Sequence, residues 1–152
     1  MKIYGICSLR RKKRNFAVAV KTCWSQVKRN YFLHLEDDWN FIKIVDFSIA
    51  VEKLFSKDDI VAVMLSRFDK KESPKTLLSP ALWKTSAARN IISKMVDNDN
   101  PEQQIKNLTG RNSSIWYPID YPVVKDIGRK WKIENHLPKH MLSKTSYDIM
   151  LG

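Results

Sequence analysis

The stretch YFLHLEDDWNF (Tyr31–Phe41) joins an apolar segment directly to three consecutive acidic residues. Tyr31–Leu35 has the aromatic and aliphatic composition of a buried strand, and Glu36, Asp37 and Asp38 follow it without a spacer. Carboxylates this close raise one another's pKa unless a cation neutralises them. We therefore expect a strand whose carboxyl end carries the functional chemistry of the chain.

The sequence on both sides of this stretch alternates between strand and helix patterns. Upstream, Lys2–Leu9 predicts a strand, and Asn15–Arg29 has helical periodicity with Asn15 as its N-cap. The predicted downstream elements are a helix over Ile42–Phe55, a central strand over Ile60–Ser66, an extended segment over Leu77–Trp83, a helix from Thr85 or Ser86 to Val96, a helix over Glu102–Leu108 that begins after Pro101, and a short strand near Val123–Val124.

This alternation predicts an α/β fold with a small, mostly parallel sheet and right-handed crossovers. Pro80 excludes Leu77–Trp83 from a central strand position, because proline donates no hydrogen bond to a ladder. The 152 residues fit one domain, and the pattern assigns no element to the tail, residues 132–152. Ligands of such sheets bind beyond the carboxyl ends of the strands, where Glu36–Asp38 lie.

The amino-acid composition limits both the structural class of the protein and the kind of partner that it binds. With 43% hydrophobic residues and few Gly or Pro, the chain can bury a core, and no apolar run reaches the roughly 18 residues that span a bilayer. No secretory signal and no disulfide framework are visible, so we expect a cytoplasmic protein. The net charge of +11 indicates an anionic partner, such as nucleic acid, a phosphorylated ligand or an acidic glycan, or else serves solubility alone.

The acidic cluster has the chemistry of a divalent-metal site. In an extended segment Glu36 and Asp38 point to one side, and such a pair of oxygen ligands suits Mg²⁺ or Mn²⁺. A metal here would bridge the phosphates of a substrate and stabilise a leaving diphosphate. The alternative is a turn that leads into a helix N-terminus, where acidic residues are favoured by the helix dipole.

The same stretch resembles the strand and EDDW segment of glycosyltransferase-like domains of the GT-A type, including viral and bacterial members. Weaker similarity extends to the helix Ala19–Val27 and to the segments LSPALW (Leu78–Trp83), NPEQQI (Asn100–Ile105) and VVKDIGRKW (Val123–Trp131). The resemblance implies a shortened GT-A three-layer fold and metal-assisted transfer of a sugar from a nucleotide-sugar donor to an acceptor. The acceptor is expected to be anionic, either nucleic acid or glycan.

The resemblance also implies roles for particular residues. Glu36 and Asp38, with Asp37 beside them, correspond to the element that binds ribose and metal, and a C-terminal histidine, His136 or His140, is a candidate further ligand. Glu102 lies where these enzymes often keep an acid near the acceptor, and a carboxylate there can take a proton from a hydroxyl. The alternative for Glu102 is stabilisation of a helix N-terminus.

Four further assignments have a structural alternative beside the functional one. Trp39 and Trp83 are candidates to stack on a sugar or base, although either also suits a core or rim. Asp126 and Arg129 are candidates to engage diphosphate or acceptor, or to pair with each other.

The basic run Arg10–Arg14 follows the first predicted strand. Arg10 and Arg11 are candidates to bind phosphate, and a solvated helix start is the alternative.

The chain departs from the GT-A pattern in its first half, because Lys2–Leu9 connects to the acidic strand through a single helix. The acid expected near the first strand, which holds the nucleoside, is missing, although the first strand can still pair with the acidic one. This departure supports a second hypothesis, a catalytically inactive basic binding protein on the same scaffold, with nucleic acid as partner. A metal-dependent nuclease or phosphotransferase is a third hypothesis that no second acidic cluster supports.

Overall fold

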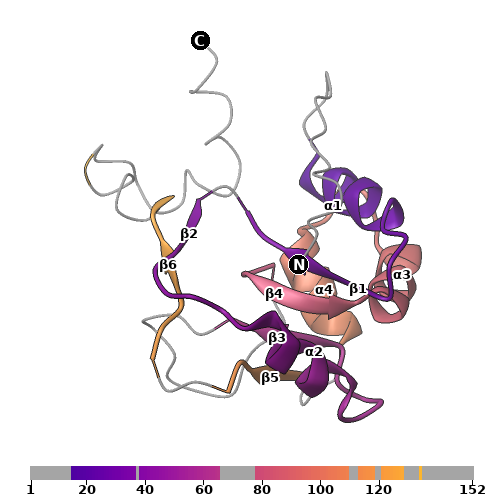
Figure 1. Cartoon of the computed structure of the whole chain (residues 1–152). Helices are drawn as coiled ribbons and strands as arrows, with labels where there is room; N and C mark the ends of the chain where they lie inside the picture. Colours follow the sequence, from indigo (N-terminus) through magenta and orange to yellow (C-terminus); the bar gives the residue numbers. More distant parts are fainter. Residues whose placement is uncertain are drawn as a thin grey trace.

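The computed structural model describes residues 15–36, 38–65, 78–109, 113–118, 121–128 and 134 (Figure 1). The predicted strand Lys2–Leu9, the basic run Arg10–Arg14 and, except for Glu134, the tail lie outside the described residues. The elements in chain order are α1 (Phe16–Ser25), β1 (Tyr31–His34), β2 (Trp39–Phe41), α2 (Phe47–Phe55), β3 (Ala62–Met64), β4 (Ala81–Lys84), α3 (Thr85–Lys94), α4 (Pro101–Leu108), β5 (Ser114–Trp116) and β6 (Val124–Asp126).

The main sheet has the strand order β1-β4-β3-β5. β4 pairs antiparallel with β1 on one side and with β3 on the other, while β3 and β5 pair in parallel. For the residues that the structure describes, the prediction of a mostly parallel sheet is therefore wrong, because two of the three pairings in the main sheet are antiparallel. The α/β class itself is confirmed.

The direction of β4 explains this difference. β1, β3 and β5 all run the same way, as expected for strands joined by helical crossovers. β4 runs the opposite way and inserts between β1 and β3, so that those two parallel strands are not neighbours. A helix between two strands in the sequence predicts their direction, but it does not show which strand will lie between them.

The position of β4 also corrects the prediction made from Pro80. The segment is central in the sheet, and Pro80 stands immediately before its first residue, Ala81. There the missing N–H of proline costs nothing, since the carbonyl oxygen of Pro80 still accepts the N–H of Leu65 at 2.9 Å. Proline therefore begins this strand instead of excluding it.

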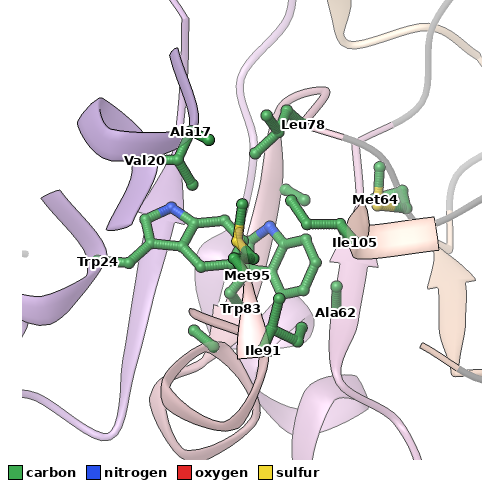
Figure 2. Packing of buried hydrophobic residues seen from close by; sticks show 12 residues of the cluster. Ala17, Val20, Trp24, Ala62, Met64, Leu78, Trp83, Ile91, Met95 and Ile105 are labelled. Atoms are coloured by element: carbon green, nitrogen blue, oxygen red, sulfur yellow. The ribbon is translucent and has the colours of Figure 1, made fainter. Parts of the chain in front are cut away.

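Side chains of successive strand residues enter two different cores, one on each face of the sheet. In β4, Ala81 and Trp83 belong to the first core, whereas Leu82 belongs to the second. The first core lies under α1, α3 and α4, and Figure 2 shows Trp24 and Trp83 side by side at its centre. The second core lies under α2 and includes Val124 of β6. The two-residue period of the strands therefore produces three layers with helices on both faces.

Helix ends follow local capping chemistry. Asn15 caps α1 through Val18 N–H, as predicted, and Asn100 caps α4 with Pro101 at its first position. The helix predicted from Ile42 begins only at Phe47, because Asp46 caps it by accepting the N–H of Ser48. None of the helices formed by the described residues is long and apolar enough to cross a membrane.

The predicted N-cap of α3 is wrong. Lys84 holds that position without a side-chain hydrogen bond. The Thr85 hydroxyl donates instead to the carbonyl oxygen of Arg29 at 2.6 Å, so it ties α3 to the segment before β1.

Candidate functional site

The carboxyl ends of β1, β3 and β5 lie at one edge of the main sheet, because these three strands share a direction. Glu36 and Asp38 follow β1 at this edge, and both side chains are half-buried. Tyr117 follows β5 there, and its N–H donates to the carbonyl oxygen of Met64 at 2.8 Å. The acidic residues therefore occupy the edge of the sheet where ligands of α/β proteins bind.

Beyond this edge the chain forms a two-stranded antiparallel ribbon of β2 and β6 (Figure 1). Trp39 lies directly opposite Asp126, and Phe41 lies opposite Val124. The ribbon thus joins the EDDW segment to the VVKDIGRKW segment, which are far apart in the sequence. Opposite residues of such a pair share a face, so Trp39 and Asp126 are neighbours at the candidate site.

The ribbon is fixed to the second core at its base. Val123 and Val124 are fully buried, Trp39 packs against the same core, and the N–H of Ile42 donates to the carbonyl oxygen of Val123 at 2.9 Å. At the other end of the ribbon, the carbonyl oxygen of Asp38 accepts the N–H of Ile127 at 2.8 Å. The backbone of Asp38 is therefore positioned by β6 as well as by β1.

A second anchor joins the segment after β2 to the segment after β5. The Tyr117 hydroxyl donates to the carbonyl oxygen of Asp46 at 3.1 Å and accepts the N–H of Asp46 at 3.0 Å. Asp46 in turn caps α2, and the hydrogen bond from the Ser48 hydroxyl lowers the pKa of its carboxyl. This arrangement fixes where α2 begins relative to the carboxyl edge of the sheet.

His34, two residues before Glu36, is part of the core. Its Nδ1 accepts the Nε1–H of Trp24 at 3.3 Å, and burial lowers its pKa from 6.5 to about 4, an effect that the Leu78 backbone opposes without cancelling. The imidazole is therefore neutral at physiological pH. His34 therefore packs against Trp24 of the first core.

Glu102 lies in the helix layer that covers the first core. α4 packs against α1, and the turn that precedes α4 contacts the start of α1 through the hydrogen bond from Asn15 Nδ2 to Asn98 Oδ1 at 3.3 Å. Glu102 is half-buried in the first turn of α4, and Ile105 of the same helix belongs to the first core. Glu102 therefore lies in the helix layer over the first core, whereas Val124 of the ribbon belongs to the second core.

The two tryptophans differ in their access to a ligand. Trp83 is fully buried and its ring centroid lies 4.8 Å from that of Trp24, so a sugar cannot stack on it in this structure. Trp83 therefore takes the core alternative. Trp39 packs against the second core but stays half-buried, which leaves part of its ring open to solvent.

The described residues supply part of the expected metal site. Among them no group of three or more His, Cys, Asp or Glu side chains is placed to hold a metal ion. Glu36 and Asp38 are half-buried, and the expected extended segment is a turn, in which the Trp39 N–H donates to the carbonyl oxygen of Glu36 at 3.4 Å. Their carboxylates are of the ligand type that a hard divalent cation prefers. The other expected ligands, Asp37 and His136, lie outside the described residues, as do Arg10, Arg11 and Arg129.

Two parts of this site are not evident in the sequence. β2 has only three residues, too few for a two-residue period to be recognised, and no strand is predicted over its sequence. Gly128 contacts the side chain of Asp38 directly. The one available signal was the rarity of glycine, since the chain has only 4 Gly.

Comparison of the chain with protein-family models, with curated proteins and with solved structures found no match. The similarity to GT-A domains therefore rests on the sequence segments themselves.

Proposed function

We propose that the protein is a glycosyltransferase-like enzyme that transfers a sugar from a nucleotide-sugar donor with the help of a divalent cation. One observation carries the proposal: the EDDW segment pairs with the VVKDIGRKW segment at the carboxyl end of β1, and the Ile127 N–H holds the Asp38 backbone there. Two stretches chosen from sequence alone thus form one locus at the edge of the sheet where ligands bind.

Each residue at this locus has a distinct part in the proposed reaction. Asp38 and Glu36 would hold Mn²⁺ or Mg²⁺ against the donor diphosphate, and the bound cation would offset the negative charge that develops on the leaving diphosphate. Trp39 and Asp126 share a face and would contact the donor sugar or the acceptor. Glu102, in the first turn of α4, would accept the proton of the acceptor hydroxyl.

Calorimetric titration tests this proposal with the four common nucleoside diphosphates, each with and without Mn²⁺. We expect binding that requires the metal, and at least tenfold weaker binding for Asp38→Asn, which keeps the shape of the side chain but lowers its affinity for a cation. Asp59→Asn is the matched control, because Asp59 is exposed in the turn before β3, at the opposite edge of the sheet. Metal-independent binding that Asp38→Asn leaves unchanged would refute the proposal.

A second candidate function, binding of nucleic acid without catalysis, is favoured by the charge of the chain. The net charge is +11, and Lys28, Arg29 and Arg89 are exposed where α3 meets the segment before β1. The Arg89 guanidinium donates to the carbonyl oxygen of Val27, which places it beside the other two cations. This function predicts binding to single-stranded DNA that weakens steeply with salt and that survives Asp38→Asn.

A further inference from the structure

Gly128 and Asp38 approach each other more closely than any side chain at position 128 allows. A Cβ atom on Gly128 would lie 2.8 Å from both Cβ and Oδ2 of Asp38, and 3.3 Å from its Cγ. Carbon atoms in folded proteins do not pack at 2.8 Å without displacement, because repulsion rises steeply inside van der Waals contact. The space beside Gly128 is therefore occupied by the Asp38 side chain.

The constraint at Gly128 comes from space and not from backbone conformation. Its φ lies outside the left-handed region, so an alanine could adopt this backbone conformation without strain. The adjoining backbone is tied to the same partner, because the carbonyl oxygen of Asp38 accepts the N–H of Ile127 at 2.8 Å and that of Gly128 at 3.4 Å. A methyl group at position 128 thus requires either a shift of the Asp38 side chain or an opening of the ribbon end.

We propose that Gly128 is a positioning residue: the hydrogen atom in place of its side chain sets where the Asp38 carboxylate lies at the end of β1. Oδ1 of Asp38 is buried and Oδ2 faces Gly128, so the approach from position 128 governs both the direction and the solvent access of the carboxylate. A ligand group must be held to within about 0.5 Å to be effective. The importance of this positioning for cation binding rests on the function proposed above.

Two measurements on Gly128→Ala test this inference, with Lys125→Ala as the matched control, because Lys125 is exposed on β6, three residues before Gly128. In the titration with nucleoside diphosphate and Mn²⁺, we expect Gly128→Ala to weaken binding at least tenfold and Lys125→Ala to change it less than twofold. Wild-type binding in Gly128→Ala would overturn the inference while leaving the proposed function intact.

The second measurement does not depend on the proposed function. Thermal unfolding is compared for Gly128→Ala alone and in an Asp38→Gly background, which removes the three atoms that would lie nearest to the new methyl group. We expect the loss in Tm caused by Gly128→Ala to fall by at least half in that background, and the loss caused by Lys125→Ala to be the same in both.

An equal loss from Gly128→Ala in both backgrounds would overturn the inference, whether or not any nucleotide binds. If Gly128→Ala does not fold, recovery of folding in the double variant supports the inference, and failure of the double variant where Asp38→Gly alone folds overturns it.

Discussion

The core under α1, α3 and α4 and the ribbon of β2 and β6 are built in opposite ways. The core contains two fully buried tryptophans that contact each other, Trp24 and Trp83, surrounded by side chains from three helices and two strands. The ribbon consists of two three-residue strands and exposes large apolar side chains, Phe41 and Ile127 among them, while Ile44 in the adjoining loop is 93% exposed. The core therefore provides stability, and the ribbon carries the candidate functional residues.

This contrast shows how a two-stranded ribbon can carry a functional site while contributing little to the stability of the protein. The ribbon is positioned by a few specific contacts, namely the buried Val123 and Val124 at its base and the hydrogen bonds donated by the N–H groups of Ile42 and Ile127 at its ends. Segments with few buried contacts open at low cost in free energy, and ligand-binding segments are commonly of this kind. The following predictions test how separate the two regions are.

The largest effect is expected in the first core. Trp83→Ala removes a fully buried ring from the contact with Trp24, and we expect a loss of about 3–5 kcal/mol in the free energy of unfolding. Trp39→Ala, in the ribbon, removes a half-buried ring, and we expect about 1–2 kcal/mol. Urea denaturation measures both, and equal losses for the two variants would show that the ribbon is as important for stability as the core.

The second largest effect is a loss of stability at acidic pH, and it comes from a histidine that contacts the first core. His34 has a pKa of about 4 when folded and 6.5 in its ordinary state, so the unfolded chain takes up the proton first as the pH falls. Above pH 6.5 His34 is neutral in both the folded and the unfolded state, and protonation does not reduce the stability. Between pH 6.5 and 4 the unfolded chain is protonated before the folded one, so the free energy of unfolding falls by on the order of 3 kcal/mol.

The measurement is the free energy of unfolding at a series of pH values, for wild type and for His34→Gln in the same buffers. We expect the difference between the two proteins to change over this interval, since glutamine does not titrate. A constant difference would mean that the histidine is not kept neutral by the core.

The smallest effect is expected at the second anchor of the site. Tyr117→Phe removes the hydroxyl that binds both the N–H and the carbonyl oxygen of Asp46, and we expect a loss of about 1–2 kcal/mol. Tyr121→Phe is the control, because that ring is 50% exposed, and it should change stability by less than about 0.5 kcal/mol. If the two variants are equally stable, the segment before α2 is held by other contacts.

Elements with a long or clearly capped pattern could be predicted from the sequence. Asn15 and Asn100 mark the starts of α1 and α4, and the apolar run Ile60–Ser66 contains β3. β2 and β5 were missed because three residues carry too little periodicity to be distinguished from loop. Their existence depends on partners: β2 needs β6, and β5 needs β3, both from distant parts of the chain.

Only part of the candidate site could be predicted from the sequence, because other parts depend on residues that are distant along the chain. A row of carboxylates after an apolar strand is visible in any sequence, and the structure places Glu36 and Asp38 at the carboxyl edge of the sheet as expected. The contribution of Gly128 was not visible, because it depends on a distance to Asp38 that no pattern along the chain encodes. The burial of Trp83 was equally hidden, since a tryptophan in a strand suits a core and a ligand surface alike.

By itself, the sequence determined which segments contain helices, the N-cap of α1, and that the acidic residues follow a strand, because these properties depend on neighbours within a few residues. Only the tertiary structure decided that β4 enters the sheet between β1 and β3, that Trp83 is enclosed, and that Gly128 meets Asp38. These outcomes depend on which surfaces bury each other best once the whole chain is assembled, and that selection takes place between residues far apart in the sequence.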